Sequence, residues 1–168
     1  RTRWDKGDWL PAVSPSHSRE PAHRAFPKKL EDWDIERIVR DFADAAERMK
    51  AAGLDGLEIE SYGHLMDQFW SPLTNTLEGP YGGSLENRMR FTFDVLRAMR
   101  ERVGERFLVG IRYTADEMLA GGITKEEGIE ISKRLKNSGL VDFLNVVRGH
   151  LETDAGLTDV IPIMGMKS

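Results

Sequence analysis

The chain has 168 residues, of which 40% are hydrophobic and 31% are charged, and its formal net charge is -4. This composition is typical of a water-soluble globular protein, and it gives no electrostatic reason to expect nucleic acid or an anionic membrane as a partner. No apolar run approaches the roughly 18 residues that a membrane-spanning helix needs. The absence of cysteine excludes disulfides and cysteine-ligated metal within this stretch and agrees with a reducing compartment, so we expect a cytoplasmic protein.

The chain begins with an irregular segment. Prolines recur among polar residues over positions 1–31, which predicts a loop leader, and residues 32–168 then alternate between helical and strand patterns. The chain does not open with Met, and its apolar last residues have nothing after them to pack on. We therefore interpret residues 1–168 as a fragment of a single larger domain.

Helices and strands alternate along the rest of the chain. Apolar residues at helical spacing predict three helices, over residues 34–52, 84–103 and 124–138. Short apolar runs predict three strands, over residues 54–60, 107–113 and 141–147. The expected helix caps are Asp32 or Asp34 for the first helix, Ser84 for the second, and Thr124 in a capping box with Glu127 for the third.

This alternation predicts an α/β fold with a parallel sheet, because strands joined by crossover helices pair in parallel. Two architectures fit, a doubly wound sheet and part of an eight-fold β/α barrel. A complete barrel takes about 250 residues, so this chain holds at most part of one. In either architecture ligands gather where the strands end and the following loops begin.

Polar side chains crowd the end of the first predicted strand, where Glu60, Tyr62 and His64 follow one another closely. A His and a Tyr at a strand end can donate a proton and orient a ligand, and imidazole titrates close to neutral pH. The alternative is that loop backbone satisfies both side chains. The residues alone give the two interpretations equal weight.

Arg112 ends the second predicted strand after a run of apolar residues and glycine. A guanidinium at such a place needs an anionic or carbonyl partner, because burying it unpaired costs a large amount of free energy. The partner is either a structural carboxylate, Glu58 or Glu60 on the neighbouring strand, or the negative charge of a ligand.

The remaining candidates carry weaker signals. The segment from Tyr81 to Arg88 is a Gly-Gly turn into a helix capped by Ser84, which we interpret as mainly structural. His150 follows the third strand and Trp70 could line an apolar pocket, so both are candidates for substrate binding. No cluster of His, Asp and Glu has metal-ligand spacing, and we expect no metal site.

At this point the sequence resembles the Old Yellow Enzyme-like flavin oxidoreductases, the NADH:flavin oxidoreductase group. The segments that carry the resemblance are AAGLDGLEI (51–59), QFWSP (68–72), YGGSLENR (81–88) and VGIR (109–112). Within the group, the sequence is most similar to the branch that holds trimethylamine dehydrogenase, dienoyl-CoA reductase, and the dimethylglycine and N-methylproline demethylases. The segments SYGHLMDQFW (61–70) and VRGHLETD (147–154) resemble the demethylases in particular.

The resemblance implies a barrel with FMN at its mouth, with the three predicted strands as the fourth, fifth and sixth. Arg112 matches the family's arginine beside the flavin pyrimidine ring. Many members read H-x-x-N-G-Y after the fourth strand, where this chain is one residue shorter. His64 then takes the place of the family's Tyr, Tyr62 that of Asn, and Glu60 that of His.

That departure favours a cationic amine over an enone as substrate, because a carboxylate and an aromatic ring suit a positive charge. The implied reaction passes a hydride from the substrate carbon to the flavin, and water hydrolyses the resulting iminium to formaldehyde and a shortened amine. His64 and Tyr62 would be catalytic, Arg112 would bind the cofactor, and Glu60, Tyr62, His150 and Trp70 would contact the substrate.

The resemblance also implies partners outside this stretch. NAD(P)H is a second candidate cofactor, and larger members add a 4Fe-4S cluster and a second nucleotide beyond the barrel. We expect a small-molecule substrate, a homo-oligomeric full-length protein, and an isolated fragment that is inactive. The alternatives are an NAD(P)H-dependent enone or enoyl reductase of the same family and a non-catalytic truncated barrel piece.

Overall fold

The computed structural model of the chain describes residues 12–18 and 26–150. In chain order its elements are β1 (Val13–Ser14), β2 (Lys28–Lys29), α1 (Asp32–Ala51), β3 (Gly56–Glu60), α2 (Leu65–Trp70), α3 (Leu85–Val103), β4 (Leu108–Thr114), α4 (Lys125–Ser138) and β5 (Phe143–Val147). Strands β3, β4 and β5 form a parallel sheet in that order. The predicted α/β class with parallel strands is confirmed. None of the helices in the described part of the chain is long and apolar enough to cross a membrane.

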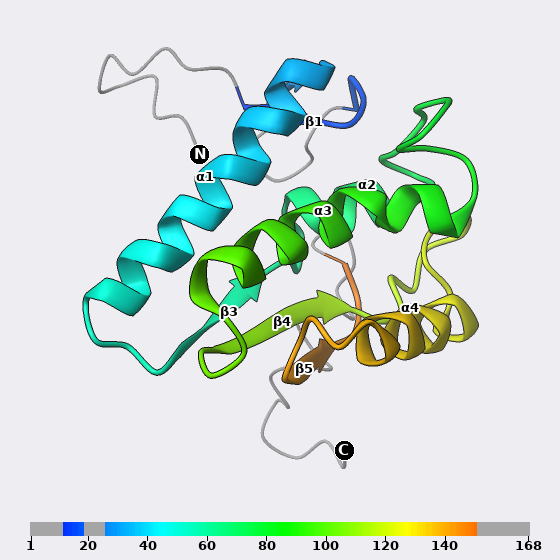
Figure 1. Cartoon of the computed structure of the whole chain (residues 1–168). Helices are drawn as coiled ribbons and strands as arrows, with labels where there is room; N and C mark the ends of the chain where they lie inside the picture. Colours follow the sequence, from blue (N-terminus) through cyan, green and yellow to red (C-terminus); the bar gives the residue numbers. More distant parts are fainter. Residues whose placement is uncertain (1–11, 19–25, 151–168) are drawn as a thin grey trace, which may run out of the picture.

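One face of the sheet packs against helices. In β4, Val109, Ile111 and Tyr113 alternate onto this face and are fully buried. They belong to one apolar core with α3 residues such as Val95 and Met99. Figure 1 shows α1 and α3 running side by side over the sheet, and the two helices contact each other extensively. This core holds the strands in place and so fixes where their carboxyl ends lie.

The other face of the sheet carries no covering layer within the described residues. On this face Glu60 of β3 stands in register beside Arg112 of β4, which stands beside Asn145 of β5. Closer to the amino ends, Phe143 of β5 is 43% exposed although it lies over Gly110. A Cβ at Gly110 would come within 2.1 Å of the Phe143 ring, so only glycine lets this ring lie against the sheet. An apolar ring and charged groups therefore share one open face.

Besides shifts of one or two residues at the ends of elements, the observed structure differs from the predicted one in three respects. Helix α1 is capped by Glu31 rather than by Asp32 or Asp34, and Asp34 completes a capping box by accepting the Glu31 N–H at 3.1 Å. The expected loop leader contains the short parallel pair of β1 and β2. The loop expected between β3 and α3 contains the helix α2, whose Met66, Phe69 and Trp70 face the core.

The Gly-Gly-Ser turn is structural, as the sequence predicts. A Cβ at Gly82 would come within 1.9 Å of the Leu77 carbonyl oxygen, and Ser84 caps α3 by accepting the Asn87 N–H at 3.3 Å. Arg88, which is 6% exposed, donates to the Trp70 and Gly83 carbonyl oxygens and pairs with Glu127 of α4. This one guanidinium ties α2, the turn and α4 to α3.

Replacing Arg88 by Ala should therefore lower the free energy of unfolding by about 3 kcal/mol or more, since it leaves buried acceptors and the Glu127 carboxylate without their partner. The matched control is Arg90→Ala on the same helix, where the exposed guanidinium donates to the Pro80 carbonyl oxygen at 2.8 Å. That loss should stay within about 1 kcal/mol. Urea unfolding measures both, and equal losses would contradict the structural role given to Arg88.

Candidate functional site

Arg112 lies on the open face near the carboxyl end of β4. Its Nη1 donates to Glu60 Oε2 at 3.2 Å, so the carboxylate that the sequence offered as a structural partner does pair with it. Both side chains are partly exposed, at 34% and 44%. Arg112 Nε is a buried nitrogen without a hydrogen-bond partner in the described structure. The guanidinium therefore has donor capacity that this part of the chain does not satisfy.

The turn after β3 rests on the backbone of the same arginine. The N–H groups of Ser61 and Tyr62 both donate to the Arg112 carbonyl oxygen, at 2.8 and 3.2 Å. The ring of Tyr62 then lies over the side chain, with 5.9 Å between the Arg112 Cζ and the ring centre, a cation–π contact. Burial raises the pKa of Tyr62 and outweighs the opposing charge of Arg112, which keeps the phenol protonated. Glu60, Tyr62 and Arg112 thus form one cluster.

Of the two predicted catalytic residues, Tyr62 and His64, only Tyr62 contacts Arg112 through its side chain in the described structure. It is the N-terminal cap residue of α2, its backbone N–H donates to the Ser61 carbonyl oxygen at 2.8 Å, and its side chain is exposed. No hydrogen bond or ring contact among the described residues links its imidazole to Tyr62 or Arg112. His64 therefore stands on the same turn as Tyr62 without touching the cluster.

His150 lies beside a buried carboxylate that the sequence analysis missed. Its Nε2 is 3.9 Å from Glu117 Oε1. Glu117, on the loop after β4, is 3% exposed, and its other oxygen accepts from Ser71 Oγ and the Ile123 N–H, both at 2.7 Å. The loops after β4 and β5 therefore meet at this carboxylate, at the same end of the sheet as Arg112.

Trp70 belongs to the core. It is fully buried, its indole N–H donates to Thr92 Oγ1 at 2.8 Å, and its ring packs edge-on against Tyr113 at 5.5 Å. This places it on the helix-covered side of the sheet, away from the open face. We therefore leave Trp70 out of the candidate site, because α2 turns its side chain inward.

Asn145, which the sequence analysis missed, also lies next to the cluster. Asn145 Nδ2 donates to Glu58 Oε2 at 3.1 Å across the open face, above Gly110. Side chains alternate between the two faces of a strand, so in FLNVV (143–147) Asn145 points to the other face from the apolar residues next to it. This signal could have placed it beside Arg112.

The described residues contain no group of His, Asp and Glu that could hold a metal ion.

Asp67 is a buried titratable group next to the turn that carries Tyr62. Its carboxylate accepts from Ser61 Oγ at 2.8 Å and from the Gly63 and Thr114 N–H groups at 3.3 Å each. Burial, only partly offset by these hydrogen bonds, raises its pKa to about 7. An acidic residue inside the apolar run LMDQFW (65–70) is the signal that could have marked it.

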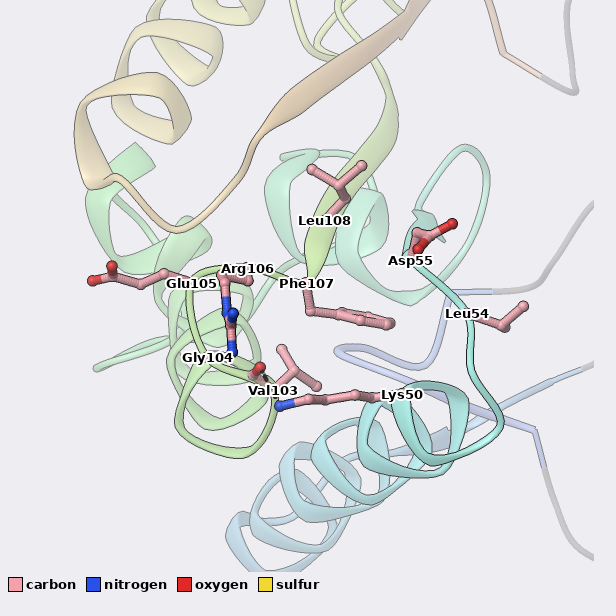
Figure 2. A pocket seen from close by; sticks show the side chains of 9 residues that line it. All are labelled: Lys50, Leu54, Asp55, Val103, Gly104, Glu105, Arg106, Phe107 and Leu108. Atoms are coloured by element: carbon pink, nitrogen blue, oxygen red, sulfur yellow. Dashed lines mark hydrogen bonds between the residues drawn. The ribbon is translucent and has the colours of Figure 1, made fainter.

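A separate hollow of about 720 Å³ lies at the other end of the sheet. Figure 2 shows it between the end of α1, with Lys50, and the segments that enter β3 and β4, with Leu54, Asp55 and Phe107. These residues precede the strands, so the hollow is at their amino ends. It is therefore distinct from the cluster around Arg112.

The raised pKa of Asp67 predicts an unusual pH dependence of stability. The folded state binds the proton more tightly than the unfolded chain, whose pKa is near the ordinary 3.8, so the free energy of unfolding falls as pH rises from about 4 to 7. Asp67→Asn removes this dependence. Its free energy of unfolding, relative to the wild type, should rise by up to about 4 kcal/mol between pH 4 and pH 8, as measured by urea unfolding.

The matched control is Asp142→Asn. Burial opposes ionisation of Asp142, but hydrogen bonds from the Val109 N–H and from Arg100 outweigh it and lower the pKa of this carboxyl. The stability that ionised Asp142 contributes is lost only as pH falls below the ordinary pKa range of Asp. Asp142→Asn should therefore have a free energy of unfolding that is lower than that of the wild type by a constant amount between about pH 5 and 8. A relative stability of Asp67→Asn that is flat over that range would contradict the assignment.

The chain is similar to known proteins over most of its length. The model of the NADH:flavin oxidoreductase / NADH oxidase family matches residues 7–154. The chain is 75% identical over 166 residues to a probable N-methylproline demethylase of Rhizobium meliloti (strain 1021). This alignment covers 99% of this chain and 24% of that protein. It is 46% identical over 165 residues to the N,N-dimethylglycine/sarcosine dehydrogenase of Chromohalobacter salexigens, covering 98% of this chain and 24% of that protein.

Among solved structures, a complex of 2-naphthoyl-CoA reductase superposes with a TM-score of 0.78 at 31% identity, over 84% of this chain and 22% of that one. The chain thus spans about a quarter of the length of these curated relatives. The match over most of its residues, at these identities, shows that the chain belongs to the NADH:flavin oxidoreductase / NADH oxidase family.

Proposed function

We propose that this chain forms strands four to six of an eight-stranded β/α barrel, and that the complete barrel protein uses FMN to oxidise an N-methylated amine. The observation that carries the proposal is the cluster of Arg112, Glu60 and Tyr62 at the carboxyl ends of β3 and β4. Barrel enzymes place their chemistry at this end of the strands.

The open face of the sheet supports the barrel. The three strands are parallel and in sequential order, and within residues 12–18 and 26–150 helices cover only one side of the sheet. The bare side carries Phe143 as well as charged residues, and such apolar surface is normally covered in a stable fold. In a barrel this side faces the interior, and the remaining strands of the longer protein close over it.

Arg112 fits a flavin. Its guanidinium keeps a buried Nε without an acceptor after pairing with Glu60, and a ring carbonyl or an anionic ring nitrogen is the kind of acceptor that it lacks. A positive charge there would stabilise the electron-rich reduced ring. The flavin itself, once bound, supplies the acceptor for the hydride of the substrate carbon.

Glu60 and Tyr62 fit a cationic amine. The Glu60 carboxylate is partly exposed and keeps an oxygen beyond the one that accepts from Arg112, while the Tyr62 ring offers its π-face. Arg112 and the substrate nitrogen would thus share one carboxylate. The names of the two curated relatives, a probable N-methylproline demethylase and an N,N-dimethylglycine/sarcosine dehydrogenase, support this substrate class.

Fewer observations support the other predicted roles. His64 and His150 would handle the amine proton from the rim, since both lie at the carboxyl ends of the strands. NAD(P)H, a 4Fe-4S cluster, a second nucleotide, a cytoplasmic location and a homo-oligomeric assembly stay predictions on which no described residue bears. An NAD(P)H-dependent reductase of the same family is the second candidate function, because the structural neighbour 2-naphthoyl-CoA reductase is named as a reductase.

The complete protein should purify yellow, and anaerobic N,N-dimethylglycine or N-methylproline should bleach its flavin absorbance. Glu60→Gln should need at least about ten times more amine for the same rate, because it removes a charge-assisted contact worth roughly 1.5–3 kcal/mol. Its flavin content should be unchanged.

The control for that experiment is Glu130→Gln on α4, whose carboxylate pairs with Arg134 on the outer surface and should behave as the wild type. Bleaching by NADH but not by either amine would favour the reductase. A colourless protein that takes up no added FMN would favour a barrel without catalysis and would overturn the proposal.

A further inference from the structure

The proposed chemistry leaves one deeply buried acid without a role. Asp67 is 5% exposed, and the groups that donate hydrogen bonds to it belong to the turn after β3 and to the end of β4. One oxygen accepts from Ser61 Oγ, and the other accepts from the Gly63 and Thr114 N–H groups. A single carboxylate thus joins two neighbouring strand ends.

Tyr62 lies between the two turn residues that Asp67 holds. Ser61 precedes it and Gly63 follows it, while its own N–H donates to the Arg112 carbonyl oxygen at 3.2 Å. On the other side, Thr114 lies two residues beyond Arg112 on β4. Asp67 therefore restrains both residues that flank Tyr62 and the strand that carries Arg112.

The turn needs such a restraint. Gly63 has a φ of 65°, in the left-handed region that residues other than glycine rarely adopt. Glycine permits this conformation but does not enforce it, because it also samples many others. The hydrogen bonds to Asp67 and to the Arg112 carbonyl oxygen select the one conformation that lays the Tyr62 ring over the guanidinium.

We propose that Asp67 is a positioning residue, which sets the place of Tyr62 against Arg112 and thereby the affinity of the site for a substrate ammonium group. The proposal rests on the proposed function, since it assumes that Tyr62 contacts the amine. The plain alternative is a structural clamp that contributes stability alone. The two differ in whether loss of Asp67 acts through Tyr62.

Asp142 provides a matched comparison on the same strand. It accepts the Val109 N–H at 2.7 Å near the amino end of β4, as Asp67 accepts the Thr114 N–H at its carboxyl end. It also pairs with Arg100 at 2.6 Å. Both carboxylates hold β4 through a backbone N–H, but only Asp67 adjoins the turn that carries Tyr62.

The test uses the complete, flavin-loaded protein and tetramethylammonium, a cation without a nitrogen lone pair that cannot be oxidised to an iminium. Its dissociation constant is measured from the change in flavin absorbance. Asp67→Ala should weaken binding by about tenfold, the size of a lost cation–π contact in a partly desolvated site. Tyr62→Ala should weaken it similarly, and the double variant should be no weaker than Tyr62→Ala, because the two residues act as one unit.

Asp142→Asn should lower the melting temperature and leave this dissociation constant within about twofold of the wild type, as expected for a site far from the mutation. Should Asp67→Ala not fold, Ser61→Ala removes one donor to the carboxylate and should weaken binding by about threefold in the same, non-additive way. Two results would overturn the positioning role. In one, the effects of Asp67→Ala and Tyr62→Ala on the dissociation constant multiply in the double variant; in the other, Asp67→Ala binds tetramethylammonium like the wild type.

The same titration separates this proposal from the proposed function. A wild-type protein that responds to tetramethylammonium and is reduced by the N-methylated amine, with no effect of Asp67→Ala, overturns the positioning role alone. A wild-type protein whose flavin responds to neither compound overturns both.

Discussion

The half-buried guanidinium of Arg112 is the constraint on which the candidate site depends. A cation at the end of a buried strand must be paired, and Glu60 on the adjacent strand supplies the charge at 3.2 Å. The backbone of the same residue accepts two N–H groups of the turn after β3, which lays Tyr62 over the cation. One residue of β4 thus organises the polar groups of two neighbouring strand ends, and none of the described residues supplies an acceptor for its Nε.

The scaffold and the chemistry use different parts of the sequence. The turn of Gly82, Gly83 and Ser84, with Arg88, fastens helices and loops to one another and lies outside the Arg112 cluster. These residues carry much of the family resemblance but none of the proposed chemistry. The short stretch between Glu60 and Asp67 carries part of the proposed chemistry, and there the chain departs from the pattern H-x-x-N-G-Y that the resemblance implies. This departure is one reason why we propose an amine rather than an enone as substrate.

Most of the fold could be predicted from periodicity. The long helices and the strands of the sheet came from apolar residues at helical or strand spacing, and α3 and α4 begin after the predicted caps, Ser84 and Thr124. Helix α2 was missed because six residues give too few turns for a periodic signal. The cap of α1 was misplaced because Glu31 is not a typical capping residue, and it caps only with the help of Asp34.

The candidate site could be predicted only in part. The pairing of Glu60 with Arg112 follows from adjacent parallel strands in register, and the sequence offered it as one of two interpretations. The partners of Asp67 and Glu117 could not be predicted, because they are backbone N–H groups and hydroxyls that only the fold brings together. Trp70 was assigned to the substrate site because the sequence analysis took its segment for a loop. The segment is the helix α2, which turns this side chain into the core.

The central claim is that the Arg112 cation faces the reduced flavin ring, and the most direct measurement is the two-electron midpoint potential of the bound flavin. Removing the cation with Arg112→Ala should make that potential more negative by about 30 mV or more, which corresponds to roughly 1.4 kcal/mol for a two-electron couple. A variant that binds flavin at an unchanged potential would contradict the account.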